Sequence, residues 1–315
     1  MKKCLGLALF LLGIYLLLLM ADPGARSLYN HINLGRRIGL YGIISLGAGM
    51  LIISDGIDLS IGSTIGLCAT VMAMLLVDYH WNPLLAVLVV LALGAVIGLT
   101  NGLLVTKLRI QAFVVTLCGL FVYRGAARWL SRDQVKGLGT DYESLKYWLS
   151  DSRDVLGLPM SLVIFLGLAA VATVFLHMSV AGRYLFAVGS NEQAARYSGI
   201  AVDRYRILAY VLCSVLAALF SILFLMEQNS VQPTETGSFF ELYAIAGAVL
   251  GGCSLRGGEG NVLGIIIGTA ILWILPNFTK MWGVPSELEY TVIGVALLIG
   301  ALVDEGLRRG GVRKK

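Results

Sequence analysis

The sequence predicts an all-α, polytopic integral membrane protein with about ten transmembrane helices, some of them short or re-entrant. Its 315 residues are 57% hydrophobic and 14% charged, whereas soluble domains are about a quarter charged. The mean hydropathy is +0.83. Apolar stretches long enough to cross about 30 Å of hydrocarbon follow one another almost without interruption. We therefore expect a single membrane domain over residues 1–315.

The expected spans are the apolar runs between charged or glycine-rich gaps. They are residues 4–21, 37–54, 59–77, 84–106, 110–130, 158–178, 206–226, 240–252, 261–280 and 289–304. The run 240–252 is too short to cross untilted, and only a short polar motif separates 37–54 from 59–77. Broken or re-entrant helices are tolerated where their exposed backbone faces protein or water. The first run follows Met1-Lys2-Lys3 like a signal peptide, but no clear cleavage site follows, so we expect an uncleaved helix.

Lysine and arginine distribution sets the expected topology. With a cytoplasmic N-terminus, the inner gaps carry more basic residues than the outer ones, which favours both termini in the cytoplasm. The loop 131–157 is then extracytoplasmic and the loop 179–205 cytoplasmic. Basic residues are spread over many gaps rather than clustered with aromatic ones, so a nucleic-acid partner is not expected. The five cysteines show no CxxC spacing and read as small buried hydrophobic residues.

The inner loop contains the start and stop signals of a short helix. Ser190 is the expected N-cap, with Gln193 three residues later, and Gly199 is the expected end. Such a helix lies at the membrane surface, where two roles remain open. It is either a connector whose arginines pair with anionic membrane lipid or a docking helix for a soluble partner.

The motif DGIDLSIGS, residues 55–63, separates the second and third spans and contains two acids. We expect Asp58 to cap the third span by accepting backbone N–H bonds at its positive end. We expect Asp55 to be a turn residue solvated at the membrane edge. Direct contact of either acid with a transported substrate is the alternative.

Polar residues in or beside the spans are candidates for a translocation path, although such residues also join helices to one another. They are Thr100, Asn101, Gln111, Thr116, Glu227, Gln228, Asn229 and Gln232. Arg124 and Arg128 share one helix face and are expected to snorkel or to pair with a carboxylate. Glu235 and Glu241 are expected near the outer surface. Residues 251–260 lack the lysine of a phosphate loop and predict a sharp turn.

Several motifs occur together in one order along the chain. They are DGIDLSIGS at 55–63, NGLLVTKLRI at 101–110, FVVTL at 113–117, YRG at 123–125, GRY at 182–184, GSNEQAARYSGI at 189–200, QPT at 232–234 and GGCSLRGG at 251–258. In these motifs the chain resembles the permease subunits of bacterial ABC importers for sugars, the ribose, galactose, xylose and arabinose group. Branched-chain amino acid permeases are more distant relatives. The resemblance covers about residues 35 to 304.

The resemblance implies a role, a location and partners. A permease of this kind passes a monosaccharide from an extracytoplasmic sugar-binding protein to the cytoplasm across the inner membrane. It works with a second permease subunit, identical or different, and with separate ATP-binding subunits. Its coupling helix rests in a cleft of the ATP-binding subunit, and here the matching residues are Glu192, Ala194, Ala195, Arg196 and Gly199. The chain has no Gly-x-x-x-x-Gly-Lys-Ser/Thr stretch, so we expect no ATP hydrolysis, no catalytic residue, no metal and no cofactor on it.

Three departures from the family pattern leave the substrate open. Asp55 stands where glycine is more usual, Tyr243 where aspartate is common, and residues 275–280 replace an Asn-Asn-Gly-like stretch. A branched-chain amino acid or nucleoside ABC permease is therefore an alternative. An ion-coupled secondary transporter would need a relay of carboxylates or histidines deep in the spans, and the three histidines lie near span ends. A scaffold protein would not need the helix signals of the inner loop.

Overall fold

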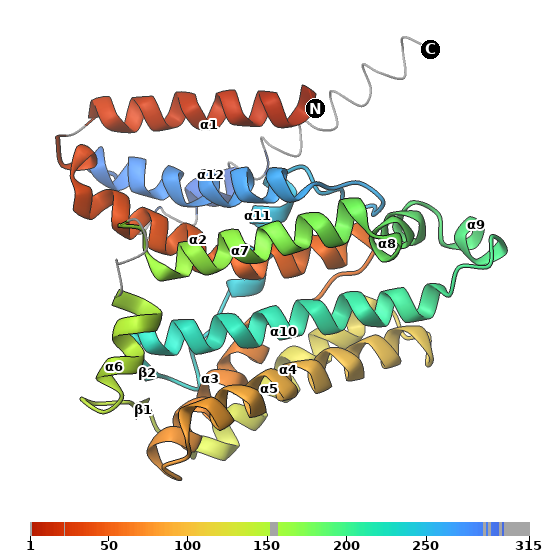
Figure 1. The fold of residues 1–315 in the computed structure, drawn as a ribbon, viewed down its shortest axis with the longest axis horizontal. Coiled ribbons are helices and arrows are strands. Elements are labelled where there is room, and N and C mark those ends of the chain that lie inside the picture. Colours follow the sequence, from red (N-terminus) through yellow and green to blue (C-terminus); the bar gives the residue numbers. More distant parts are fainter. Residues whose placement is uncertain are drawn as a thin grey trace.

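The computed structural model describes residues 2–21, 23–151, 157–285, 288, 291–295 and 298. Its long helices run side by side across the molecule (Figure 1), which confirms the all-α membrane fold. Within the described residues, six helices are long and apolar enough to cross a membrane. They are α2 (Leu28–Ile53), α4 (Pro83–Thr106), α5 (Ala112–Ser131), α7 (Met160–Thr173) with its π-helical continuation η3 (Val174–Met178), α10 (Val202–Gln228) and α12 (Val262–Met281).

Three further apolar helices and several short elements complete the described chain. The apolar helices are α1 (Lys2–Ala21), α3 (Ile61–Val77) and α11 (Phe240–Leu250). The short elements are η1 (Pro23–Arg26), β1 (Lys136–Gly137), α6 (Glu143–Lys146), the π-helical turn η2 (Tyr147–Asp151), α8 (Val180–Ser190), α9 (Glu192–Tyr197) and β2 (Ser230–Val231). Strands β1 and β2 pair antiparallel, with Lys136 opposite Val231. We call the two ends of the bundle the ladder end, after these strands, and the α9 end.

Nine of the ten expected spans correspond to helices, and the tenth, 289–304, lies largely outside the described residues. Helix α2 begins at Leu28 rather than at residue 37. Ser27 caps it by accepting a hydrogen bond from the backbone N–H of Asn30. The polar residues of the stretch 28–36 are typical of a loop, which is why hydropathy placed the start of the span too late. Several of these side chains are satisfied by other helices, as when Asn30 and Asn277 of α12 exchange hydrogen bonds.

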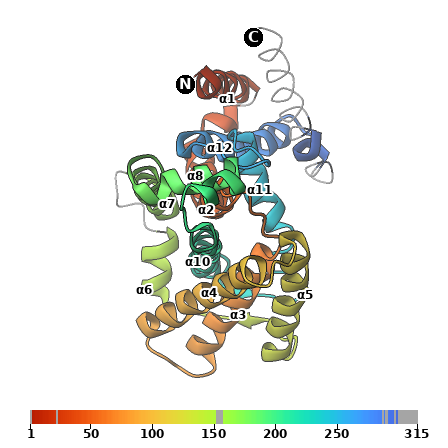
Figure 2. The same ribbon diagram turned by 90° about the vertical axis from the view of Figure 1, so that its right-hand side faces the viewer.

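Helix α2 is the centre of the bundle. In its apolar window 83% of the residues are buried, against 22–28% in α4, α5 and α7. It packs against α7, α10, α11 and α12, and viewed along the bundle it lies among them (Figure 2). Helices α3 and α4 pack on another side of α10, and α5 packs outside α3. The largest core therefore surrounds α2.

Helix α3 is a partial span that starts inside the bundle. It ends level with α10, because its C-cap Asp78 pairs with Lys136, and Lys136 lies opposite Val231, just past the end of α10. Helix α3 has 17 residues and α10 has 27, so α3 begins about 15 Å short of the start of α10 at a rise of about 1.5 Å per residue. The hydroxyl of Tyr210, two turns into α10, donates to the carbonyl of Ile57 at 3.2 Å. The break after α2 was predicted from the sequence, and the structure shows that its later residues lie within the bundle.

Candidate functional site

Helix α9 stands apart from the bundle at one end (Figure 1). Asn191 caps it, because its side chain accepts a hydrogen bond from the backbone N–H of Ala194 at 2.9 Å. The expected cap, Ser190, is instead the last residue of α8. That helix occupies 11 residues of the segment 179–205 that was expected to be a loop. Its mixed polar and apolar sequence explains why hydropathy missed it. A separate helix therefore leads the chain out to α9.

The predicted end of α9 is confirmed. Gly199 has φ +81, and its backbone N–H donates to Arg196 while that of Ile200 donates to Ala195. These two bonds form the Schellman arrangement, in which a residue with positive φ satisfies the last carbonyls of a helix. Glycine occupies this position without the steric cost that a Cβ would bring.

The two faces of α9 differ. Ala195 is 5% exposed and packs with Val188 of α8 and Val202 of α10, so it anchors the helix and does not offer an outer surface. Ala194 is exposed, and Tyr197 is 91% exposed. An aromatic side chain held this far into solvent on an anchored helix is a surface available to a partner.

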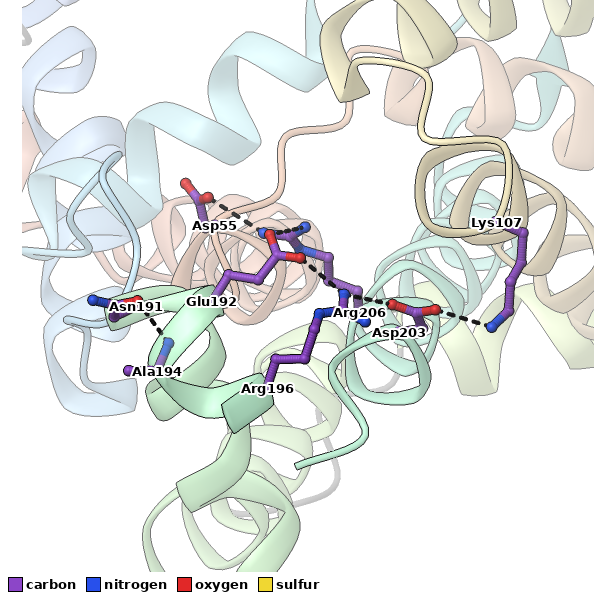
Figure 3. A network of polar contacts seen from close by, with 8 residues as sticks. All are labelled: Asp55, Lys107, Asn191, Glu192, Ala194, Arg196, Asp203 and Arg206. Carbon is purple, nitrogen blue, oxygen red and sulfur yellow. Dashed lines mark hydrogen bonds and ion pairs between the residues drawn. The ribbon is translucent and has the colours of Figure 1, made fainter. Parts of the chain in front are cut away.

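A chain of ion pairs fixes α9 to three other elements (Figure 3). Glu192 accepts from Arg196 at 3.0 Å on α9 itself and from Arg206 of α10 at 2.9 Å. Arg206 also reaches Asp55, in the turn after α2, at 3.4 Å. Arg196 continues the chain to Asp203 of α10 at 2.9 Å. Asp203 in turn accepts from Lys107 at the end of α4, also at 2.9 Å.

Burial and neighbouring charges shift the pKa values of Asp55 and Glu192, the two acids that contact Arg206. Partial burial raises the pKa of Asp55, against the attraction of Arg206 and with the repulsion of Glu192. The 3.4 Å contact with Arg206 is thus too weak to reverse the effect of burial. Burial also acts to raise the pKa of Glu192, but the hydrogen bond from Arg196 and the charge of Arg206 lower it below its usual value. Glu192 is therefore the better-held carboxylate of the network.

A backbone junction lies beside this network. A Cβ at Gly189, near the end of α8, would lie 1.8 Å from the carbonyl oxygen of Ile53 at the end of α2. The same carbonyl accepts the backbone N–H of Gly258 at 2.9 Å. Gly258 belongs to the stretch 251–260, which forms turns between α11 and α12 as predicted. The helix leading to α9 therefore contacts both glycine-rich breaks.

The second acid of the break belongs to a buried polar network. Asp58 is 2% exposed, and its Oδ1 accepts from the backbone N–H of Ser60 at 2.7 Å and from the Ser60 hydroxyl at 2.5 Å. Asn101 of α4 donates to that hydroxyl at 3.1 Å and accepts from Tyr123 of α5 at 2.7 Å. Among the described residues, nothing bonds to the second Asp58 oxygen, Oδ2. The network joins α3, α4 and α5 where α3 begins.

The expected cap of α3 needs correction. The helix starts at Ile61, and Asp58 bonds to Ser60, the residue before it, in a local turn rather than to N–H groups of the first turn. Among the described residues no side chain caps α3, and the Glu241 carboxylate of α11 packs close to Gly62, where an added Cβ would lie 2.3 Å from Glu241 Oε2. Glu241 is 8% exposed and not at the outer surface, because the chain turns inward before α11 begins. Sequence could not predict that Glu241 packs against the start of α3, since the two are far apart along the chain.

The remaining polar candidates divide into satisfied and exposed groups. The hydroxyls of Thr100 and Thr116 donate to carbonyls within their own helices, so these bonds satisfy the hydroxyls without joining one helix to another. Arg128 pairs with Asp133 at 2.8 Å, the carboxylate partner expected for one of the two arginines. Gln232 is exposed in the segment between β2 and α11. A substrate contact by Asp55, Asp58, Asn101 or Gln232 stays a prediction.

Comparisons with known proteins agree with this architecture. The family model described as "Branched-chain amino acid transport system / permease component" matches residues 30–301. The ribose import permease protein RbsC of Escherichia coli K12 is 38% identical, over 90% of this chain and 88% of that protein. RbsC of Bacillus subtilis 168 is 36% identical over 93% and 91%. The autoinducer 2 import system permease protein LsrC of Enterobacter sp. strain 638 is 38% identical over 85% and 76%.

No solved structure matches the chain. The family model nevertheless matches most of the chain. The alignments with the two ribose import permeases also cover most of those proteins. Broken apolar helices around a central span and a short helix outside the bundle are consistent with such a protein. The chain therefore belongs to the family of branched-chain amino acid transport system permease components, and within it to the permeases of sugar ABC importers.

Proposed function

We propose that this chain is the membrane subunit of an ATP-driven importer. It receives a neutral monosaccharide from an extracytoplasmic binding protein and releases it into the cytoplasm. A second permease chain completes the membrane unit, and separate ATP-binding subunits supply the energy. Ribose import, which the names of the most similar relatives state, supports a sugar as the substrate.

One observation carries the proposal: α9 is a short, anchored helix with an exposed outer face. The side chain of Ala195 and the ion pairs of Glu192 fix it to α8 and α10. The small Ala194 and the exposed Tyr197 are left free for contact with a partner. A helix that transmits the movement of a partner must be rigidly attached to the bundle. A loop that only connects two spans and pairs with lipid headgroups needs no such attachment.

The proposal assigns the α9 end to the cytoplasm. Helix α1 starts on the side of the molecule nearer to that end (Figure 1), so the start of the chain is assigned to the cytoplasm as well, in agreement with the distribution of basic residues. The loop 131–157 belongs to the opposite side, where the ladder lies. The binding protein therefore docks at the ladder end.

A charge swap, Glu192→Lys with Arg196→Glu, would be an ambiguous test of docking. Both side chains already serve in intramolecular pairs. The swap would place an ammonium group against Arg206 and a carboxylate against Asp203. Its effect would combine a loosened α9 with any lost contact to the partner. Tyr197 avoids this difficulty because its ring is almost fully exposed.

The test replaces Tyr197 by alanine and measures ATP hydrolysis and sugar uptake in the complete complex, with labelled D-ribose, D-galactose, D-xylose and L-arabinose. Phe121→Ala is the matched control, because the Phe121 ring is 68% exposed midway along α5, away from both ends of the bundle. We expect Tyr197→Ala to lower uptake and its associated hydrolysis by about tenfold, since a buried interface tyrosine contributes on the order of 1–2 kcal/mol or more. Equal activity of the two variants would refute docking through α9.

A further inference from the structure

The segment 232–239, between β2 and α11, is non-helical, and its backbone packs against α3 and α5. Its backbone folds in successive turns, with the N–H of Glu235 donating to Gln232 and that of Ser238 donating to Glu235. Arg124 of α5 donates to the carbonyl oxygens of Pro233, at 3.1 Å, and Thr236, at 2.5 Å. A charged side chain thus satisfies backbone carbonyls that no helix or sheet could satisfy.

The inner part of this segment lies at the depth of the hydrocarbon. A Cβ at Gly62 would be 2.1 Å from the carbonyl oxygen of Gly237, and one at Gly66 would be 2.8 Å from that of Thr236. Gly62 is the second residue of α3, which begins about 15 Å from the α9 end of α10. Because the hydrocarbon is about 30 Å thick, this depth holds whichever end of the bundle faces the cytoplasm.

Polar side chains of the segment are nevertheless exposed. Pro233 and Gly237 are buried, while Thr234, Glu235 and Ser238 are exposed. Glu235 makes no ion pair within the described part of the chain. Irregular backbone at this depth is not found against lipid, but only inside protein or along a water-filled cavity. A charged carboxylate facing lipid at this depth is strongly disfavoured.

We propose that the segment 232–239 lines the aqueous path through which the substrate crosses the permease. Gln232, Thr234 and Ser238 supply neutral donors and acceptors, and the Glu235 carboxylate accepts hydrogen bonds from vicinal hydroxyls. This set fits an uncharged polyhydroxylated ligand and disfavours an anionic one. The inference rests on the proposed function, since the opposite wall of the path comes from the second permease chain.

The bundle also presents a surface of the opposite kind. Leu88, Val96 and Leu99 of α4 are exposed by 55%, 58% and 43%. This regular apolar helix face is what lipid contact requires. Leu99→Cys is therefore the matched control for Ser238→Cys, because both sites are exposed and only one adjoins water.

The experiment measures thiol reactivity in the complete complex in membrane vesicles. Cys4 and Cys118 are first replaced by serine, and the buried Cys68, Cys213 and Cys253 are kept. Ser238→Cys and Leu99→Cys are then treated with a cationic, water-soluble methanethiosulfonate. We expect Ser238→Cys to react at least about tenfold faster, because attack requires a water-exposed thiolate. Thr234→Cys replaces it if Ser238→Cys does not assemble.

Modification is also expected to abolish uptake of the labelled sugar that the parent complex carries, because it fixes a cation and added volume in the path. Ser238→Cys and Thr234→Cys reacting no faster than Leu99→Cys would overturn the inference. So would fast reaction with unchanged uptake, which marks a solvated surface outside the path. Either result leaves the proposed function standing if the parent complex transports and Tyr197→Ala impairs it. A parent complex that transports none of the four sugars refutes the proposed function instead.

Discussion

Replacing Arg206 by methionine removes the guanidinium that ties α9 to the turn after α2. Its side chain is 15% exposed, while those of Glu192 and Asp55 are 38% and 50% exposed. Hydrogen bonds to charged groups contribute about 1.5–3 kcal/mol when buried, and exposed pairs contribute about 0.2–1 kcal/mol. Water screens Glu192, and the 3.4 Å contact with Asp55 is weak. We therefore expect a loss of about 1–2 kcal/mol in the stability of the α9 attachment.

Hydrogen–deuterium exchange of the α9 amides measures this loss directly. The N–H groups of Ala195, Ser198 and Ile200 are hydrogen-bonded only while α9 is formed, so their exchange reports local opening. A loss of about 1–2 kcal/mol raises the opening constant about 5- to 30-fold, since about 1.4 kcal/mol is tenfold. The matched control is Lys107→Met, whose pair with Asp203 is more exposed, with side chains 59% and 25% exposed.

The control should raise exchange about twofold or less, because an exposed pair is worth about 0.5 kcal/mol. Equal exchange in Arg206→Met and Lys107→Met would refute the assignment of Arg206 as the anchor. A double-mutant cycle with Glu192→Gln then isolates the pair from other effects of the substitution. If Arg206→Met and Glu192→Gln act additively, the 2.9 Å contact between the two residues contributes nothing to the attachment.

Two further predictions concern the same end of the bundle. Gly189→Ala would place a Cβ 1.8 Å from the carbonyl oxygen of Ile53, and we expect a lower melting temperature of the purified permease, because overpacking costs about 1–3 kcal/mol or more. The matched control is Gly125→Ala, which should be neutral or stabilising by about 0.5–1 kcal/mol, because nothing lies within 4 Å of the added Cβ. Equal melting temperatures of Gly189→Ala and Gly125→Ala would show that the backbone at Gly189 shifts to accept the added Cβ. The lowered pKa of Glu192 means that its ion pairs contribute fully above the unfolded-state value of about 4.3 and are lost only as the pH falls through the lower folded value. A spin label at Gln193→Cys should therefore stay ordered as the pH falls to about 4.3, and loosening already near pH 5 would contradict the ion-pair account.

Hydropathy and motif spacing were sufficient to predict the helices that cross the whole membrane and face lipid. The expected limits of the span 84–106 agree within a residue with α4, because its exposed residues are apolar except for Thr100. The break at DGIDLSIGS was also predicted, since glycines and acids interrupt two apolar runs. In each case the environment of a residue follows from its neighbours in sequence, so local patterns are informative.

The parts that sequence missed depend on distant partners. The start of α2 carries Asn30, which reads as a loop residue until Asn277 is brought against it. Asp55 was expected to be a solvated turn residue. Its contact with Arg206 could not be predicted from neighbouring residues, because Arg206 is 151 positions away in the sequence. Asn191 and Ser190 are both good N-caps by composition, and only the length of α8 decides between them.

The contacts at the α9 end imply how displacement of α9 reaches the membrane interior. Gly189 leaves no space between α8 and the Ile53 carbonyl, and the same carbonyl binds Gly258. Backbone contacts of this kind cannot be absorbed by side-chain rotation, so α8 cannot approach the bundle without moving the end of α2 and the loop before α12. Beyond these breaks, α3 and α11 are in contact where the Glu241 carboxylate packs close to Gly62. We therefore expect a displacement of α9 to shift both α3 and α11. These two helices contact the segment 232–239, which we assign to the substrate path.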